Sequence, residues 1–203
     1  LLCPSQFTMT QTIPFSDKTI MPDWVNTLAQ AGHSAPSADN SQPWRFVWDG
    51  NNLKLVFDTA RGESGLGRNH PAVLISFGAV IENMIQAGVA GGIDVENWDL
   101  RYLTSKEGPF LIIPTPTQTC DSEQPPDWVV NRHTNRGAYL DKPITDDVMS
   151  ALTHEHEDDS RVIVYNDKKA IHELGRLVGA ASEIRFQTEE VHRWLGKSLR
   201  FTE

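Results

Sequence analysis

Cysteine, positive charge and long apolar runs are all scarce in this sequence of 203 residues. The two cysteines, Cys3 and Cys120, lie far apart, which excludes a disulfide-rich secreted scaffold and a zinc site built from thiolates. The sequence has 18 Lys and Arg residues and 27 Asp and Glu residues, which gives a net charge of -9. Nucleic acids and anionic membranes bind cationic surfaces, so neither is expected as a partner. No apolar run approaches the roughly 18 residues of a membrane span, and we expect a soluble, cytoplasmic protein.

The composition is that of a globular protein, with 39% hydrophobic and 22% charged residues and with 14 Gly and 12 Pro. This length is enough for one or two domains that each bury a core. Residues 1–20 are polar and show no sustained period, which predicts a mobile leader.

The first half of the chain, residues 21–113, combines helical and strand patterns. Its longest feature, residues 71–89, is apolar on almost every side, which predicts a central helix buried between layers or against a second copy of the fold. Turn residues between two alternating apolar runs predict a hairpin. The expected elements are a helix from Pro22 to about Gly32, hairpin strands over 45–48 and 53–57, the central helix, and strands over 100–104 and 110–113.

A proline-rich linker over residues 114–130 separates this half from a second one, residues 131–203. In the second half, the sequence pattern predicts a short helix that begins at residues 144–147 and a strand over 161–165. It also predicts a helix over 168–181 and a last amphipathic stretch over 187–199. Helix, loop, strand and helix follow one another in both halves, which indicates a diverged internal half-repeat. The second copy is incomplete, because the strands of the first half have no counterpart after its last helix. Either the product is truncated or the remainder lies outside this sequence.

The segment Ala35–Trp44 is the densest in side chains that could bind a ligand. It holds two prolines, an Asn and a Gln between a helix end and a strand start. One interpretation is a capped turn in which Ser37 and Asn40 bond their own backbone. The other is a rigid loop that presents neutral donors and acceptors, and the edge of Trp44, to a flat heteroaromatic ligand.

Residues 131–136, with the sequence Asn-Arg-His-Thr-Asn-Arg, form a tight cationic cluster in an acidic chain. Two guanidinium groups four residues apart, with Thr134 between them, can share one phosphate group. The alternative is a solvated basic turn that leads into a helix.

Together, these two segments resemble motifs of the nitroreductase-like flavoproteins, in particular the long, internally duplicated branch typified by the mycobacterial Acg proteins. Ala-Pro-Ser-x-x-Asn-x-Gln-Pro-Trp at 35–44 is similar to the family's loop over the flavin, and Arg-His-Thr-Asn-Arg at 132–136 is similar to its phosphate-gripping motif. The resemblance covers roughly residues 22 to 200. It implies an α+β fold with a mixed sheet flanked by helices, and FMN as cofactor.

The resemblance also implies roles for individual residues. Arg132 and Thr134 would contact the FMN phosphate, with Asn135 beside them, and Arg136 would lie near the ribityl chain and the O2/N1 edge of the flavin. The ring would be faced by the other motif, through Pro36, Ser37 and Asn40 with support from Gln42. In this family flavin N5 carries the hydride, so no catalytic acid or nucleophile is expected. Each half keeps one of the two motifs, which suggests a single site within one chain.

The implied activity is electron transfer from NADH or NADPH to a nitroaromatic or quinone acceptor. The alternatives are a protein of the same fold that holds FMN without turnover, and an inert truncated product. A homodimer or a missing C-terminal segment could complete the fold. The segment His154–Asp159 offers metal ligands but lacks the spacing of a helical metal motif, so we expect a solvated acidic loop and no metal.

Overall fold

The computed structural model describes residues 21–62, 67–101, 108–117, 124–135, 137–140, 142–153 and 162–198. The chain forms two units, the first made of residues up to 38 and 42–132, and the second of 39–41 and 133 onward. The expected leader over residues 1–20 lies outside the described residues.

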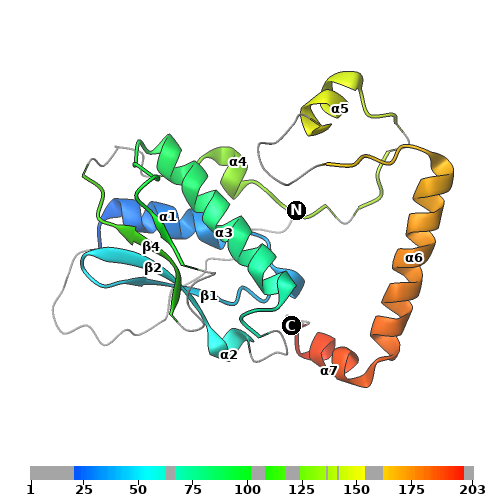
Figure 1. Ribbon diagram of the computed structural model, residues 1–203, viewed down its shortest axis with the longest axis horizontal. Coiled ribbons are helices and arrows are strands. Elements are labelled where there is room, and N and C mark those ends of the chain that lie inside the picture. The colour runs from blue at the N-terminus through cyan, green and yellow to red at the C-terminus, as the bar shows by residue number, and fades with distance from the viewer. Residues whose placement is uncertain are drawn as a thin grey trace. The chain divides into compact units, whose positions relative to one another are not determined.

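The first unit is α+β, with helices and an antiparallel sheet (Figure 1). Its strand order is β1-β2-β4-β3, and every pair of neighbours is antiparallel. The expected mixed sheet is therefore wrong for the described residues. The elements of this unit are α1 (Asp23–His33), β1 (Trp44–Trp48), β2 (Asn52–Phe57), α2 (Thr59–Gly62), α3 (Pro71–Ala90), β3 (Asp99–Leu100), β4 (Pro109–Pro114) and α4 (Asp127–Val130).

Local signals explain where these elements begin and end. Pro71 opens α3 at a position where a missing N–H costs nothing, and His70 Nδ1 accepts a hydrogen bond from Ala72 N at 3.2 Å. The hairpin of β1 and β2 turns at Gly50, whose φ of 96° suits glycine. The predicted hairpin and central helix are confirmed. The strand expected over residues 100–104 is shorter, since β3 ends at Leu100; residues 102–104 lie outside the described part.

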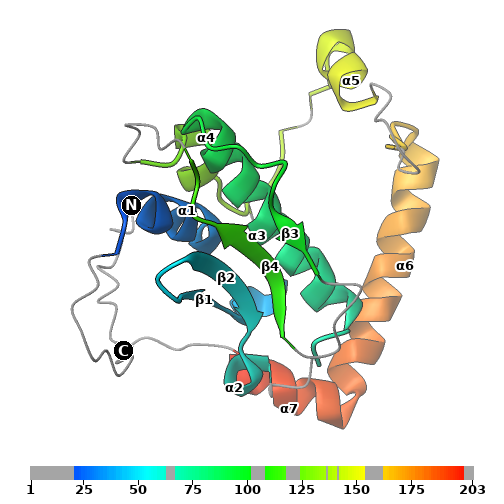
Figure 2. The ribbon, with the colours of Figure 1, turned by 60° about the vertical axis from the view of Figure 1, so that its left-hand side comes forward.

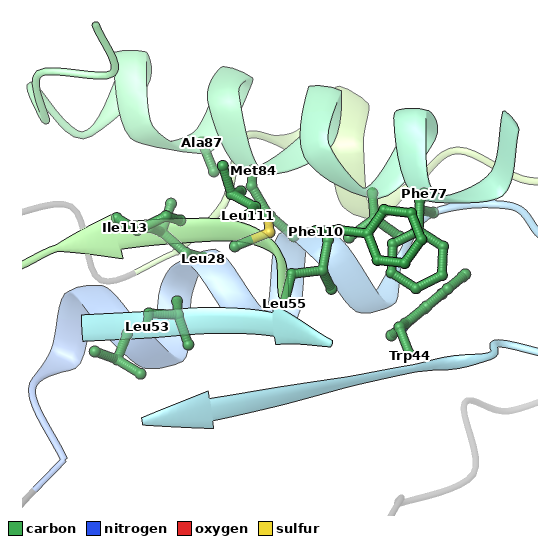
Figure 3. Close-up of a cluster of buried hydrophobic side chains, with 14 of the residues drawn as sticks. Leu28, Trp44, Leu53, Leu55, Phe77, Met84, Ala87, Phe110, Leu111 and Ile113 are labelled. Atoms are coloured by element: carbon green, nitrogen blue, oxygen red, sulfur yellow. The ribbon is translucent and has the colours of Figure 1, made fainter. Parts of the chain in front are cut away.

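The core lies between α3 and the sheet, with α1 packed beside α3 (Figures 1 and 2). Figure 3 shows Phe77, Met84 and Ala87 of α3 pointing toward side chains of the strands. Phe77 stacks on Phe110 of β4 with ring centroids 3.9 Å apart. Asn83 of α3 donates a hydrogen bond to the carbonyl of Ala31 at 3.0 Å, which ties α3 to α1.

The composition of the central helix predicted that it is buried on all sides. Within the described part of this chain it is not. Ile75 is 74% exposed and Val89 59% exposed. On the flank that carries Ile75, a groove of about 320 Å³ runs between α3 and strands β3 and β4. It is lined by Leu74, Ile75, Phe77, Gly78, Ile81, Leu100 and Phe110.

The same helix corrects the expectation on membrane spans. By length and composition α3 is apolar enough to cross a membrane. One side of it, however, is packed into the core of the first unit through Val73, Phe77, Val80 and Met84. A core helix accounts for this hydropathy.

The second unit holds α5 (Asp146–Thr153), α6 (Lys168–Gln187) and α7 (Glu189–Ser198). The strand expected over 161–165 is wrong at residues 162–165, which have no regular structure, while Arg161 lies outside the described part. The helix expected over 168–181 exists and continues to Gln187. At the end of the expected linker, α4 is helical and buries Val129 against the core of the first unit.

Candidate functional site

The loop that follows α1 is tied back to the first unit at both of its ends. Ala35 N donates to the carbonyl of Gly32 at 3.1 Å, and Ala35 is buried. At the other end, Trp44 begins β1 and pairs with Phe57 of β2. The sequence folds this way because α1 and β1 both bury apolar side chains in the same core. The loop over residues 35–43 therefore spans a fixed distance between two rigid elements.

Two serine hydroxyls hold the middle of this loop. Ser37 Oγ accepts a hydrogen bond from Gln42 N at 2.9 Å, which closes the loop on itself. Ser76 Oγ of α3 accepts from Ala38 N at 3.3 Å and donates to the carbonyl of Ala72 at 2.6 Å. Ser76 is buried, so these two hydrogen bonds attach the loop to the core-facing side of α3.

The backbone of the loop is strained. Asp39, Asn40 and Gln42 have φ angles of 49°, 54° and 46°, in the left-handed region. Asp and Asn visit this region more readily than other residues with a side chain, whereas Gln has no such advantage. Strain of this kind costs of order 1–3 kcal/mol per residue and is found most often at functional sites.

Arg132 lies 98 residues after Ser34 in the sequence and contacts it directly before this loop. Its Nε and Nη2 donate to the carbonyl of Ser34 at 3.3 and 3.1 Å. The side chain is placed by α4, which ends at Val130 and is anchored in the core by Val129. One arginine of the predicted cluster thus lies directly before Ala35 and Pro36 of the predicted loop.

Further charged groups lie on the other side of the loop, and the sequence analysis missed them. Arg61 of α2 donates from Nη1 to the carbonyl of Gln42 at 3.4 Å. Its Nε lies 3.8 Å from Oδ2 of the buried Asp58, and Arg45 Nε lies 3.6 Å from the same oxygen. The alternation of Arg45 with the apolar residues of β1 was the signal that could have placed this arginine outside the core.

His33 at the end of α1 lies near Arg61. Its ring packs edge-on against Phe46 with centroids 5.0 Å apart. Burial, and secondarily the positive charge of Arg61, lower the pKa of His33 below its usual value. This end of the site therefore favours the neutral imidazole.

The expectation for Trp44 is wrong. Its side chain is 1% exposed and packs edge to face against Phe77 at 6.1 Å, inside the core (Figure 3). Its Nε1 has no hydrogen-bond partner among the described residues. Trp44 anchors the loop to the core and does not present an edge to a ligand at the surface.

The rest of the predicted cluster belongs to the second unit. Asn135 is exposed, and its Oδ1 accepts from Gly137 N at 2.9 Å, which shapes the local turn. Thr134 is also exposed, and Arg136 lies outside the described residues. Asp39 is grouped with this unit and forms an ion pair with Arg185 of α6 at 3.0 Å.

The described part of the chain holds no group of three or more His, Cys, Asp or Glu residues that could bind a metal ion. The segment 154–159, which was considered as a source of ligands, lies outside that part.

No family model matches the chain, and no curated protein gives a match.

Proposed function

We propose that the chain is an FMN-dependent oxidoreductase of the nitroreductase type that works in the cytoplasm. The observation that supports the proposal is the contact of Arg132 with the carbonyl of Ser34, the residue directly before the strained loop. These are the two segments in which the resemblance places the FMN-binding residues. They are nearly one hundred residues apart in sequence, and their meeting was not implied by local pattern.

Individual residues of the two segments suit the chemistry of FMN. Because Nε and Nη2 of Arg132 donate to Ser34, a phosphate would be bound by two parallel hydrogen bonds through the other edge of this exposed guanidinium group, from Nη1 and Nη2. The exposed amide of Asn40 offers both a donor and an acceptor, as the edge of the flavin ring requires. Ser37 and Gln42 hold the loop in shape through the bond between Ser37 Oγ and Gln42 N.

The remaining roles follow the resemblance. Arg132 and Thr134 would hold the phosphate with Asn135 beside them, Arg136 would stabilise negative charge at the O2/N1 edge, and Pro36 would lie against the ring. FMN, when bound, would supply hydride transfer at N5 between NADH or NADPH and a nitroaromatic or quinone acceptor. The protein then needs to bind and orient, and no side chain needs to act as acid or nucleophile.

A second candidate is a protein that holds FMN without turnover. It is favoured by the exposure of Pro36, Asn40 and Arg132, because a site open to water does not protect reduced flavin. Adding NADPH to the flavin-loaded protein without oxygen distinguishes the two. Bleaching of the flavin absorbance supports the oxidoreductase, and a persistent oxidised spectrum supports storage.

Arg132→Ala tests the site itself. Losing a charge-assisted contact should weaken FMN binding by roughly 1.5–3 kcal/mol, or about 10- to 150-fold in Kd, measured by fluorescence titration. The matched control is Arg193→Ala, which removes the same charge from α7, where Arg193 pairs with Glu189 at 2.6 Å. Equal affinities of the two variants would show that Arg132 does not contact the phosphate.

Asn40→Ala tests the loop. The exposed amide is assigned to the ring, so its loss should shift the flavin absorbance spectrum or reduction potential more than the Kd. Asn131→Ala, a second exposed amide that has no assigned role, is the control. A spectrum and potential that stay unchanged in Asn40→Ala would place the flavin away from this loop.

A further inference from the structure

Gln42, at the end of the loop that follows α1, has a backbone conformation that its side chain does not favour. Its φ is 46°, in the left-handed region that asparagine and aspartate enter more readily than glutamine does. A residue stays in such a conformation only where its surroundings hold it there. The contacts that support Gln42 therefore decide whether the loop keeps its shape.

Gln42 is held through both of its backbone polar groups. Its N–H donates to Ser37 Oγ at 2.9 Å, and its carbonyl accepts from Trp44 N at 2.8 Å. The second bond closes a γ-turn centred on Pro43, whose ring fixes φ close to the value that this turn needs. The same carbonyl accepts from Nη1 of Arg61 at 3.4 Å. This last support comes from α2, outside the loop.

Asp58 fixes Arg61 in the position from which it reaches the loop. It is the single residue between β2 and α2 (Figure 2), and it is buried. Its Oδ1 accepts from Ala60 N at 3.1 Å and from Arg61 N at 3.4 Å, which holds the backbone of α2. Its Oδ2 lies 3.8 Å from Arg61 Nε, and its own N–H donates to the carbonyl of Pro43 at 3.0 Å. Asp58 thus holds both the arginine that supports Gln42 and the backbone directly after Gln42.

Arg45 provides the comparison that isolates the contact with the loop. Its Nε lies 3.6 Å from Oδ2 of Asp58, so Arg45 and Arg61 share one carboxylate. Their side chains are 50% and 40% exposed. Arg61 also donates to the carbonyl of Gln42, whereas Arg45 contacts only Asp58 among the charged and polar groups of the described chain. The two arginines therefore differ mainly in the contact with the loop.

We propose that Arg61 and Asp58 are positioning residues, which hold Gln42 in the left-handed conformation and so keep the loop in the form that binds its ligand. The proposal rests on the proposed function for the identity of the ligand, FMN, and on the contacts of Gln42 for the mechanism. A protein whose binding-competent form is only partly populated binds with an affinity reduced by that fraction. Loss of the contact should thus weaken binding without changing what the bound flavin touches.

Fluorescence titration with FMN tests the effect on affinity. Arg61→Met should raise the Kd about 5-fold or more, because Gln42 then has one support fewer against its strain. Arg45→Met removes the same charge from the same carboxylate and should leave the Kd unchanged. At saturating FMN, the flavin absorbance spectrum of Arg61→Met should match that of wild type. An unchanged Kd in Arg61→Met would overturn the proposal, and so would a changed spectrum at saturation, which would show direct contact with the flavin.

A double-mutant cycle tests whether the backbone of Gln42 is what Arg61 holds. Asparagine adopts the left-handed region several times more readily than most other residues, so a Gln42→Asn protein depends less on the support. Arg61→Met should therefore raise the Kd by a smaller factor in the Gln42→Asn protein than in wild type. Asp58→Asn keeps an acceptor for the N–H groups of α2 but removes the charge, and it should weaken binding as Arg61→Met does. Equal factors in both backgrounds would overturn the role in backbone conformation.

Hydrogen exchange of the ligand-free protein, measured residue by residue, separates this proposal from the proposed function. Arg61→Met should speed exchange of the Gln42 N–H about 10-fold, whereas Arg45→Met should not. Urea unfolding should give both variants the same free energy of unfolding, so that faster exchange reports on the loop. Unchanged exchange in Arg61→Met would overturn the positioning role even if the protein binds FMN. Faster exchange in a protein that does not bind FMN would support the positioning role and refute the proposed function.

Discussion

Two helical glycines of the first unit have opposite surroundings. A Cβ atom at Gly32 of α1 would lie 2.5 Å from Cζ of Phe46 and 3.1 Å from Cγ1 of Val80, whereas a Cβ at Gly78 of α3 would meet nothing within 4 Å. The close approach of α1 to its neighbours therefore requires a glycine at position 32. At position 78 the glycine only lowers helix propensity.

Gly32→Ala and Gly78→Ala should change stability in opposite directions. We expect the first to lower the free energy of unfolding by about 1–3 kcal/mol through overpacking. The second should raise it by about 0.5–1 kcal/mol, since alanine is the better helix former. Urea unfolding followed by tryptophan fluorescence measures both. A stabilised Gly32→Ala protein would show that α1 can move away from Phe46 at no cost.

Single residues also show what the sequence could predict of the site. The loop and Arg132 were identified by residue type, because amides, serine and arginine carry recognisable chemistry. The direction of Trp44 was predicted wrongly, although Trp44, Phe46 and Trp48 alternate with Arg45 and Val47 along β1. That alternation places Trp44 on the same face as two other large aromatic residues. Burial of this face in the core stabilises the fold, and it keeps the indole away from any ligand at the surface.

The hairpin of β1 and β2 shows which elements can be predicted from sequence. Its turn residues, Asp49, Gly50 and Asn51, have conformational preferences that act without help from the rest of the chain. The strand expected near Val162–Tyr165 had β-branched residues, but no turn residues that would fix a hairpin with a second strand. A strand needs a neighbour to satisfy its backbone groups, and sequence pattern does not show whether one is present.

Asp49 stabilises the hairpin turn through two kinds of contact. Its Oδ1 accepts from Asn51 N at 3.0 Å and Asn52 N at 2.8 Å, and its Oδ2 pairs with Lys54 Nζ at 2.6 Å. The bond from Lys54, followed by the backbone bond from Asn51, holds the pKa of Asp49 well below its usual value. A lowered folded-state pKa means that this contribution to stability is present above about pH 4 and is lost as the pH falls through the folded-state pKa.

Asp49→Asn and Asp49→Ala separate these contacts. Asparagine keeps an acceptor for the two N–H groups and should cost at most about 0.5 kcal/mol at pH 7, the value of a surface ion pair. Alanine removes the acceptor as well and should cost about 1 kcal/mol. Urea unfolding at pH 7 gives both values. The difference between wild type and Asp49→Asn should shrink as the pH is lowered below 4, and a constant difference would argue against the ion pair.

At the scale of the whole molecule, the sequence predicted two parts but not how unequal they are. Every buried hydrophobic residue of the described chain lies between Trp24 and Val129, in the first unit. Helix periodicity predicted α6 and α7 in the second unit without showing that no residue of α6 is buried. The contact of Arg132 with Ser34 depends on α4 packing against the core, and such long-range placement cannot be obtained from local pattern.

This distribution of buried residues predicts that the first unit unfolds on its own. A chain of residues 21–135 keeps the whole described core, so its free energy of unfolding should match that of the main transition of the full chain within about 0.5 kcal/mol. Urea unfolding followed by tryptophan fluorescence measures both values. The full chain should show little additional cooperative signal, because α6 buries no residue to support a transition of its own. Leu55→Ala, which opens a cavity at a fully buried position, should destabilise both proteins equally by about 2–5 kcal/mol. If the shorter chain fails to unfold cooperatively, the second unit supplies part of the stability of the core.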